Sequence, residues 1–106
     1  MSKIETINWH AWIDTQPGAD PKLYVTGEVR TSALNKFPVL KPAVPQGINP
    51  TILLLDLSIV EEGVGGQVVT FRPARYEQRA QSGSYIEVTI LYEGTPIAAI
   101  NVEEVS

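Results

Sequence analysis

Apolar and polar side chains alternate with a period of two residues along most of this chain, and prolines and glycines interrupt the alternation at many points. This period is typical of strands, because successive side chains of a strand point to opposite faces of a sheet. Eight prolines and eight glycines divide the 106 residues so often that no capped amphipathic helix of about ten residues fits between them. The pattern therefore predicts an all-β protein.

The alternation also predicts where the strands run and which side chains face inward. We expect strands over residues 3–13, 22–31, 51–60, 67–72, 74–79, 84–92 and 96–102, with a short edge strand over 37–40. The first strand should direct Ile7, Trp9, Ala11 and Ile13 inward and Trp12 outward. The second should bury Leu23, Val25 and Val29, and Gly27 on the same side indicates a bulge or a close approach to the backbone. Strand number and spacing favour a two-sheet antiparallel sandwich of about seven strands, as one domain over residues 1–106.

Two connections bear on the strand arrangement. Residues 32–50 carry four prolines, which remove ladder donors, but are too apolar to be left in water. We expect this Pro-rich connection to pack on a sheet. The last hairpin should have the three-residue loop 93–95, because an odd loop places the apolar residues of both strands on one face.

One short spacing resembles a feature of a known family. Gly83-x-Tyr85 is similar to the tyrosine corner of immunoglobulin-like domains. Two residues after that tyrosine those domains have an inward residue, whereas this chain has Glu87, and it has no cysteine pair beside a buried tryptophan. The resemblance implies an immunoglobulin-like sandwich in general architecture.

Composition disfavours several classes of function. A formal net charge of −4 repels phosphate backbones, so no nucleic-acid partner is expected. Without cysteine the chain has no disulfide, thiolate nucleophile or thiolate metal site. Glu5 stands where a signal peptide needs an apolar stretch, and no apolar run reaches membrane-spanning length. We therefore expect a cytoplasmic protein with no membrane partner.

Candidate catalytic and metal-binding groups are few. His10 is the only histidine, and a triad with Asp56 and Ser58 requires their strands to be neighbours. No nucleophile elbow accompanies these residues. The adjacent glutamates at 61–62 and 103–104 point to opposite sides of a strand and do not converge on a metal ion. We expect no catalytic residue, metal or cofactor, and an enzyme that uses His10 is the least favoured interpretation.

Large side chains left on the outer faces of the strands are the main functional signal. These residues need cover, because isolated domains rarely expose so many together: Trp12, Tyr24, Ile52, Leu54, Tyr85 and Leu91. Residues 32–50 or a second copy of the chain would cover them, and both alternatives stay open. A basic stretch would either hold an anionic ligand or prevent other sheets from pairing with an edge strand: Arg72, Arg75, Tyr76 and Arg79.

Two functions follow from this surface. The first is a non-enzymatic protein-interaction module that self-associates, as a dimer, or binds another protein through its outer sheet face. The second is a small-ligand or carbohydrate-binding domain with a pocket formed by Trp12, Tyr24 and Arg75.

Overall fold

Seven strands and no helix make up residues 4–106, the part of the chain that the computed structural model describes. The strands are β1 (Thr6–Asp14), β2 (Lys22–Thr31), β3 (Lys36–Pro42), β4 (Ile52–Glu61), β5 (Thr70–Arg79), β6 (Glu87–Tyr92) and β7 (Thr95–Val105). The all-β prediction is confirmed, and no helix in this range is long and apolar enough to cross a membrane. Residues 1–3, where the first predicted strand begins, lie outside the described residues.

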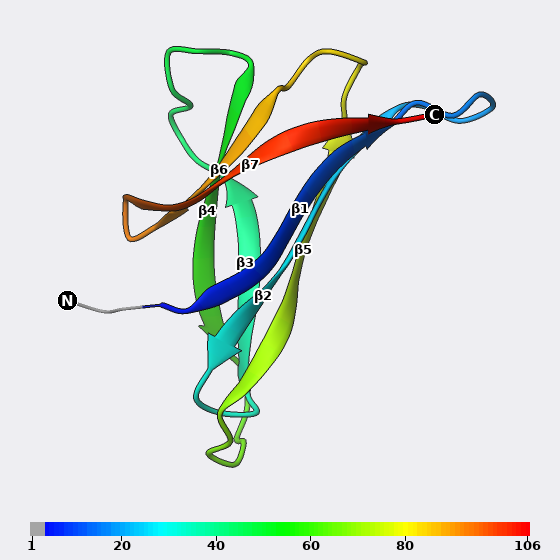
Figure 1. Cartoon of the computed structure of the whole chain (residues 1–106). Coiled ribbons are helices and arrows are strands. Elements are labelled where there is room, and N and C mark those ends of the chain that lie inside the picture. Colours follow the sequence, from blue (N-terminus) through cyan, green and yellow to red (C-terminus); the bar gives the residue numbers. More distant parts are fainter. Residues whose placement is uncertain (1–3) are drawn as a thin grey trace.

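The strands form one mixed sheet in the order β3-β4-β6-β7-β1-β2-β5 (Figure 1). The pairs β4–β6 and β1–β7 are parallel, and the other neighbours are antiparallel. Strand β7 pairs with β6 up to Asn101 and with β1 from Val102 onward. The predicted two-sheet antiparallel sandwich is therefore not confirmed, because β7 joins the two halves into one sheet. Sequence patterns missed this because a sandwich and a barrel have the same number and spacing of strands.

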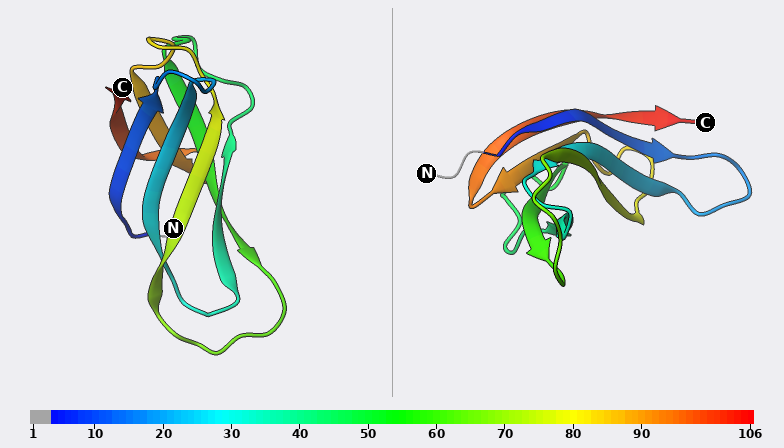
Figure 2. Two further views of the ribbon diagram at one scale, coloured as in Figure 1. Left: turned by 90° about the vertical axis from the view of Figure 1, so that its right-hand side faces the viewer. Right: turned by 90° about the horizontal axis from the view of Figure 1, so that it is seen from below.

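The sheet curls until its two edge strands, β3 and β5, face each other, so the molecule is nearly barrel-shaped (Figure 2). Side chains and loops bridge the gap between β3 and β5, which we call the seam. The Leu34 N–H donates to the Gly66 carbonyl at 2.9 Å, and Arg72 Nη2 donates to the Leu34 carbonyl at 2.6 Å. The guanidinium of Arg72 also lies 5.0 Å from the centroid of the Phe37 ring. The seam is thus held by one arginine and loop contacts, with β3 and β5 left as edge strands.

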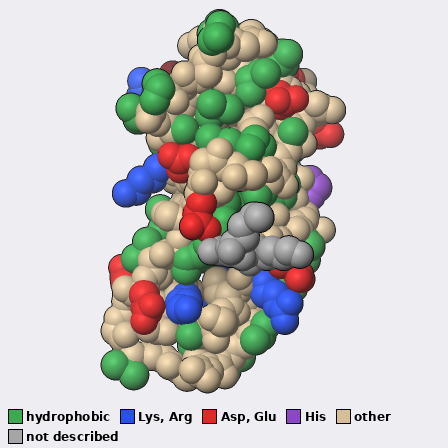
Figure 3. Space-filling model, turned by 90° about the vertical axis from the view of Figure 1, so that its left-hand side faces the viewer, with side chains coloured by type: hydrophobic (Ala, Val, Ile, Leu, Met, Phe, Trp, Pro, Cys, Tyr) green, Lys and Arg blue, Asp and Glu red, His purple; other side chains and the backbone are tan. Residues whose placement is uncertain are grey.

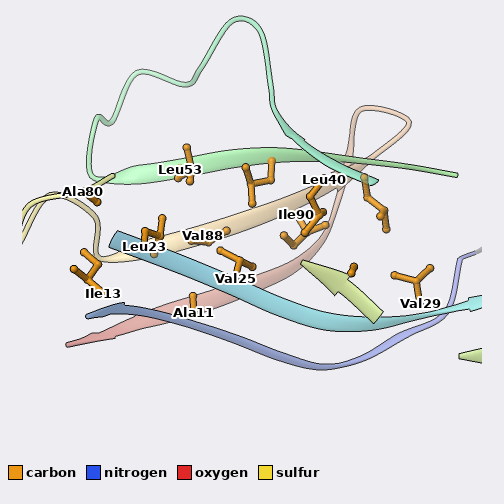
Figure 4. Packing of buried hydrophobic residues seen from close by; sticks show 13 residues of the cluster. Ala11, Ile13, Leu23, Val25, Val29, Leu40, Leu53, Ala80, Val88 and Ile90 are labelled. Atoms are coloured by element: carbon orange, nitrogen blue, oxygen red, sulfur yellow. The ribbon is translucent and has the colours of Figure 1, made fainter. Parts of the chain in front are cut away.

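Apolar side chains from the inner face fill the barrel (Figure 4). The largest fully buried ones come from β1, β2, β4 and β6: Ile13, Leu23, Val25, Val29, Leu55, Val88 and Ile90. For β2 both the bounds and the inward residues agree with the prediction. The alternation therefore sorted the core correctly wherever the strand is regular.

A β-bulge in β1 is the main irregularity on the inner face. Asn8, with φ of 58°, and Trp9 together oppose the single residue Gly27 of β2. The Trp9 ring packs directly on Gly27, which confirms the expected close approach at this glycine. The extra residue inverts the alternation before it, so Ile7, predicted to face inward, is 41% exposed.

A second bulge lies in the last hairpin. Tyr92 pairs with Thr95, so the loop contains only Glu93 and Gly94 rather than three residues. The register shifts between Ile90 and Leu91, and this bulge restores the parity that a three-residue loop would supply. Val88 and Ile90 therefore still pair with apolar residues of β7, as the sequence predicts.

Proline placement differs from the prediction at one strand. Pro73 does not divide the strand, because β5 runs unbroken over Thr70–Arg79 at the sheet edge, where one side of the strand needs no N–H donors.

In the Pro-rich connection, the expected edge strand forms as β3. Beyond β3, Val44 and Ile48 are 92% and 104% exposed.

Candidate functional site

Trp12 and Tyr24 form an aromatic pair on the outer face of the barrel. They lie directly opposite each other on β1 and β2. Their rings stack with centroids 5.5 Å apart and planes inclined by 23°. Both positions alternate with fully buried residues, so strand geometry directs the two rings away from the core. Each side chain stays partly exposed.

Strand β5 places charged side chains next to this pair. Tyr24 pairs with Glu77 and Thr26 pairs with Arg75 across β2 and β5. A hollow of about 360 Å³ lies among these side chains. The structure therefore brings together the three residues of the predicted pocket, Trp12, Tyr24 and Arg75. We name this surface the Trp12 face and define it as Trp12, Tyr24, Thr26, Arg75 and Glu77.

Sequence reasoning missed Glu77 as a member of this surface. The signal was present, because Glu77 is two residues from Arg75 and must share its face of β5. The same parity separates Arg72 from Arg75. Arg72 lies at the seam beside Phe37, whereas Arg75 and Arg79 are exposed on the outer face. The predicted basic stretch is therefore not one cluster. Its strand, β5, does lie at the edge of the sheet, where the alternative interpretation of these arginines places it.

The aliphatic members of the predicted surface lie elsewhere. Leu54 is on β4 and Leu91 is on β6, and β7 separates these strands from β1. The Pro-rich connection lies against β4 at Leu54, since the Gln46 side chain bonds both the backbone N–H and the carbonyl of Leu54 at 2.9 Å, and the Leu54 side chain stays partly exposed. These leucines and the Trp12 face do not form one continuous patch.

Tyr85 takes part in a polar chain beside the core. Gln78 Nε2 donates to the Tyr85 hydroxyl at 3.2 Å, and the Tyr76 hydroxyl donates to Gln78 Oε1 at 2.6 Å. Burial, and then the neighbouring Tyr85, raise the pKa of the Tyr76 phenol above its ordinary value. Both tyrosines pack against the core cluster. Tyr85 thus bonds a side chain of β5, and the seven-stranded mixed sheet around it differs from the immunoglobulin arrangement.

The residues of the catalytic alternative do not meet. His10 is on β1 and Asp56 and Ser58 are on β4, with β7 and β6 between these strands. Within residues 4–106, no group of three or more histidine, cysteine or acidic side chains is placed to hold a metal ion. Nothing in this described part of the chain indicates enzymatic activity.

No family model, curated protein or solved structure matches the chain. The candidate site is therefore defined by its own geometry. Its elements are a stacked aromatic pair, a cation and a carboxylate two residues apart on β5, and a hollow lined by these side chains.

Proposed function

We propose that this domain is a non-enzymatic interaction module that self-associates through the Trp12 face. The observation that carries the proposal is the stacked, partly exposed Trp12–Tyr24 pair on a rigid sheet. Aromatic residues and arginine dominate the well-packed centres of protein interfaces, because they bury a large area with few rotatable bonds. An aromatic pair held in place by two strands loses little further freedom when a partner covers it.

Charge on the same surface favours a second copy as the partner. Arg75 and Glu77 lie two residues apart on one face of β5. In a two-fold dimer the same patch meets itself, so Arg75 of each copy would face Glu77 of the other. Two such ion pairs would lie beside the aromatic contact, on its β5 side, and fix its orientation. Self-complementarity of this kind needs only residues that the Trp12 face already contains.

The test is sedimentation equilibrium over a wide range of protein concentration. The wild type should form a dimer, and Trp12→Glu should weaken it by about 30-fold or more, because removal of a hot-spot side chain costs at least about 2 kcal/mol. Lys41→Glu, on the exposed side of β3, is the matched control and should leave the dimer intact. A wild type that is monomeric up to about 1 mM would overturn the proposal.

Charge reversal tests the two-fold arrangement itself. Arg75→Glu and Glu77→Arg should each weaken the homodimer, because each places like charges opposite each other. A mixture of the two variants should recover association as a heterodimer, since both ion pairs are then restored with opposite sign. If the mixture stays as monomeric as the separate variants, the proposed pairing of these residues is wrong.

A second candidate function is the binding of a small ring-shaped ligand, such as a carbohydrate, at the same surface. The hollow of about 360 Å³ beside Trp12, Tyr24 and Arg75 favours it, since ligand pockets start at roughly 300 Å³. The probe is methyl β-glucoside added to the Trp9→Phe variant, in which Trp12 is the only tryptophan. Saturable quenching of Trp12 fluorescence would support this function, and an unchanged spectrum at high glucoside concentration would exclude this sugar.

A further inference from the structure

A second hollow, of about 660 Å³, opens at one end of the barrel and shares no residue with the Trp12 face. It lies where β2, β4 and β6 end and β3 begins. We name it the barrel mouth and define it by six lining residues: Arg30, Thr31, Lys36, Ile59, Val69 and Tyr92. The space-filling view shows a hollow bordered by Lys and Arg side chains on this side of the molecule (Figure 3). Mouths of β-barrels are common positions for small-molecule sites.

Thr31 supplies an unsatisfied polar group at the barrel mouth. The residue is only 4% exposed, and its Oγ1 has no hydrogen-bond partner among residues 4–106. Buried hydroxyl groups nearly always have a partner, because an unpaired one has lost its hydrogen bonds to water without replacement. A ligand oxygen that reached this hydroxyl would supply the missing bond.

Positive charge exceeds negative charge around the hollow. The Lys36 ammonium donates to Ser32 Oγ at 3.2 Å and forms no ion pair with any residue that the structure describes. Arg30 is paired with Glu5 at 3.2 Å, and this glutamate is the only carboxylate among the described residues that line the hollow. Glu61 stands opposite Lys36 in the β3–β4 ladder but outside this lining. The unpaired ammonium therefore favours an anionic ligand group.

The rest of the lining is apolar. Ile59 and Tyr92 face the hollow from β4 and β6, and Val69 precedes β5. Water in contact with these side chains would be displaced favourably by an alkyl chain. A ligand that suits both parts of the mouth has one small anionic end and a short apolar body.

We propose that the barrel mouth binds a medium-chain carboxylate. Its carboxylate lies between the Lys36 ammonium and the Thr31 hydroxyl, which donates to it, and its alkyl chain runs along Ile59, Val69 and Tyr92. This site is independent of self-association at the Trp12 face.

The experiment titrates octanoate into ¹⁵N-labelled full-length protein and follows amide shifts together with calorimetric heat. Octanoate should bind saturably and shift Thr31, Lys36 and Tyr92. Inorganic phosphate and octanol, which each carry only one half of the proposed ligand, should bind at least about tenfold more weakly. Shifts confined to other surfaces, or equal affinity for octanol or phosphate, would overturn the proposal.

Three variants test the assigned contacts. Lys36→Gln should weaken octanoate binding at least about tenfold, whereas Lys41→Gln on the same strand should not. Thr31→Val removes the unpaired hydroxyl, so it should raise the melting temperature of the free protein and still weaken octanoate binding. Thr31→Ser keeps the hydroxyl and should retain binding. Equal losses of octanoate affinity in the two lysine variants, or unchanged binding by Thr31→Val, would overturn the assignment. If Thr31→Val does not fold, the comparison of Lys36→Gln with Lys41→Gln decides it.

Discussion

A side chain at Gly27 should destabilise the protein as long as the Trp9 ring packs on this residue. A Cβ atom added at Gly27 would lie 2.5 Å from Trp9 Cδ2 and 2.6 Å from Cζ3, inside the contact distance of two carbon atoms. The ring is held by the packed core and by a hydrogen bond of 2.9 Å from its Nε1 to Thr6 Oγ1. We therefore expect Gly27→Ala to cost about 1–3 kcal/mol, the range for overpacked interiors. That cost lowers the urea midpoint by roughly 1 M.

The physical reason can be isolated by removing the ring. In the Trp9→Val background the clash is absent, and alanine is favoured over glycine in a strand interior by roughly 0.5–1 kcal/mol. Gly27→Ala should then stabilise the protein, so its effect changes sign between the two backgrounds. The coupling energy between the two positions is that cost plus that gain, about 1.5–4 kcal/mol.

Urea unfolding followed by far-ultraviolet circular dichroism measures all four members of this cycle without relying on tryptophan emission. Gly66→Ala is the control, because the nearest atom to its added Cβ is 4.0 Å away, and it should change stability by less than about 0.5 kcal/mol. A Gly27→Ala protein as stable as the wild type would refute the argument. So would a penalty that persists in the Trp9→Val background.

Two further predictions concern the last hairpin and the polar chain beside the core. Glu93 has φ of 51° at the first position of a two-residue turn, where asparagine is preferred. Glu93→Asn should therefore raise the free energy of unfolding by roughly 0.5–1 kcal/mol, measured by thermal unfolding. No gain in stability would mean that the turn is not strained. Because the pKa of Tyr76 is raised in the folded state, its neutral form contributes stability below the ordinary tyrosine pKa, and this contribution is lost as the pH rises through the folded value. Tyr76→Phe should therefore lessen the fall in stability at alkaline pH, and an absorbance titration of phenolate should lose a step of raised pKa.

The core was predictable because burial in a strand depends on local parity. Leu23 and Val25 are fully buried as the alternation indicates, and the bounds of β2 agree with the predicted strand. The bulge at Asn8 was not predictable, because an asparagine in the left-handed region looks like any polar residue in an alternating sequence. A single such irregularity reverses the side on which earlier residues lie, as at Ile7.

The candidate sites were predictable to different degrees. Trp12 and Tyr24 were placed on one outer face by parity alone, and their pairing across β1 and β2 agrees with it. The barrel mouth was not foreseen, because Thr31, Lys36 and Tyr92 come together only when the ends of several strands meet. Strand order is decided by packing between distant segments, and alternation carries no information about it.

Strand β7 pairs with both β6 and β1, and this double pairing has a consequence for how the chain folds. Among residues 4–106, this strand supplies the only ladder between the three-stranded group β3-β4-β6 and the three-stranded group β1-β2-β5. During synthesis, both groups must wait with open edges until residues 95–105 have left the ribosome. We therefore expect assembly to be all-or-none and governed by β7, the last of the seven described strands to be synthesised. Refolding should be slow because β1 and β7 pair although the five other strands lie between them in sequence.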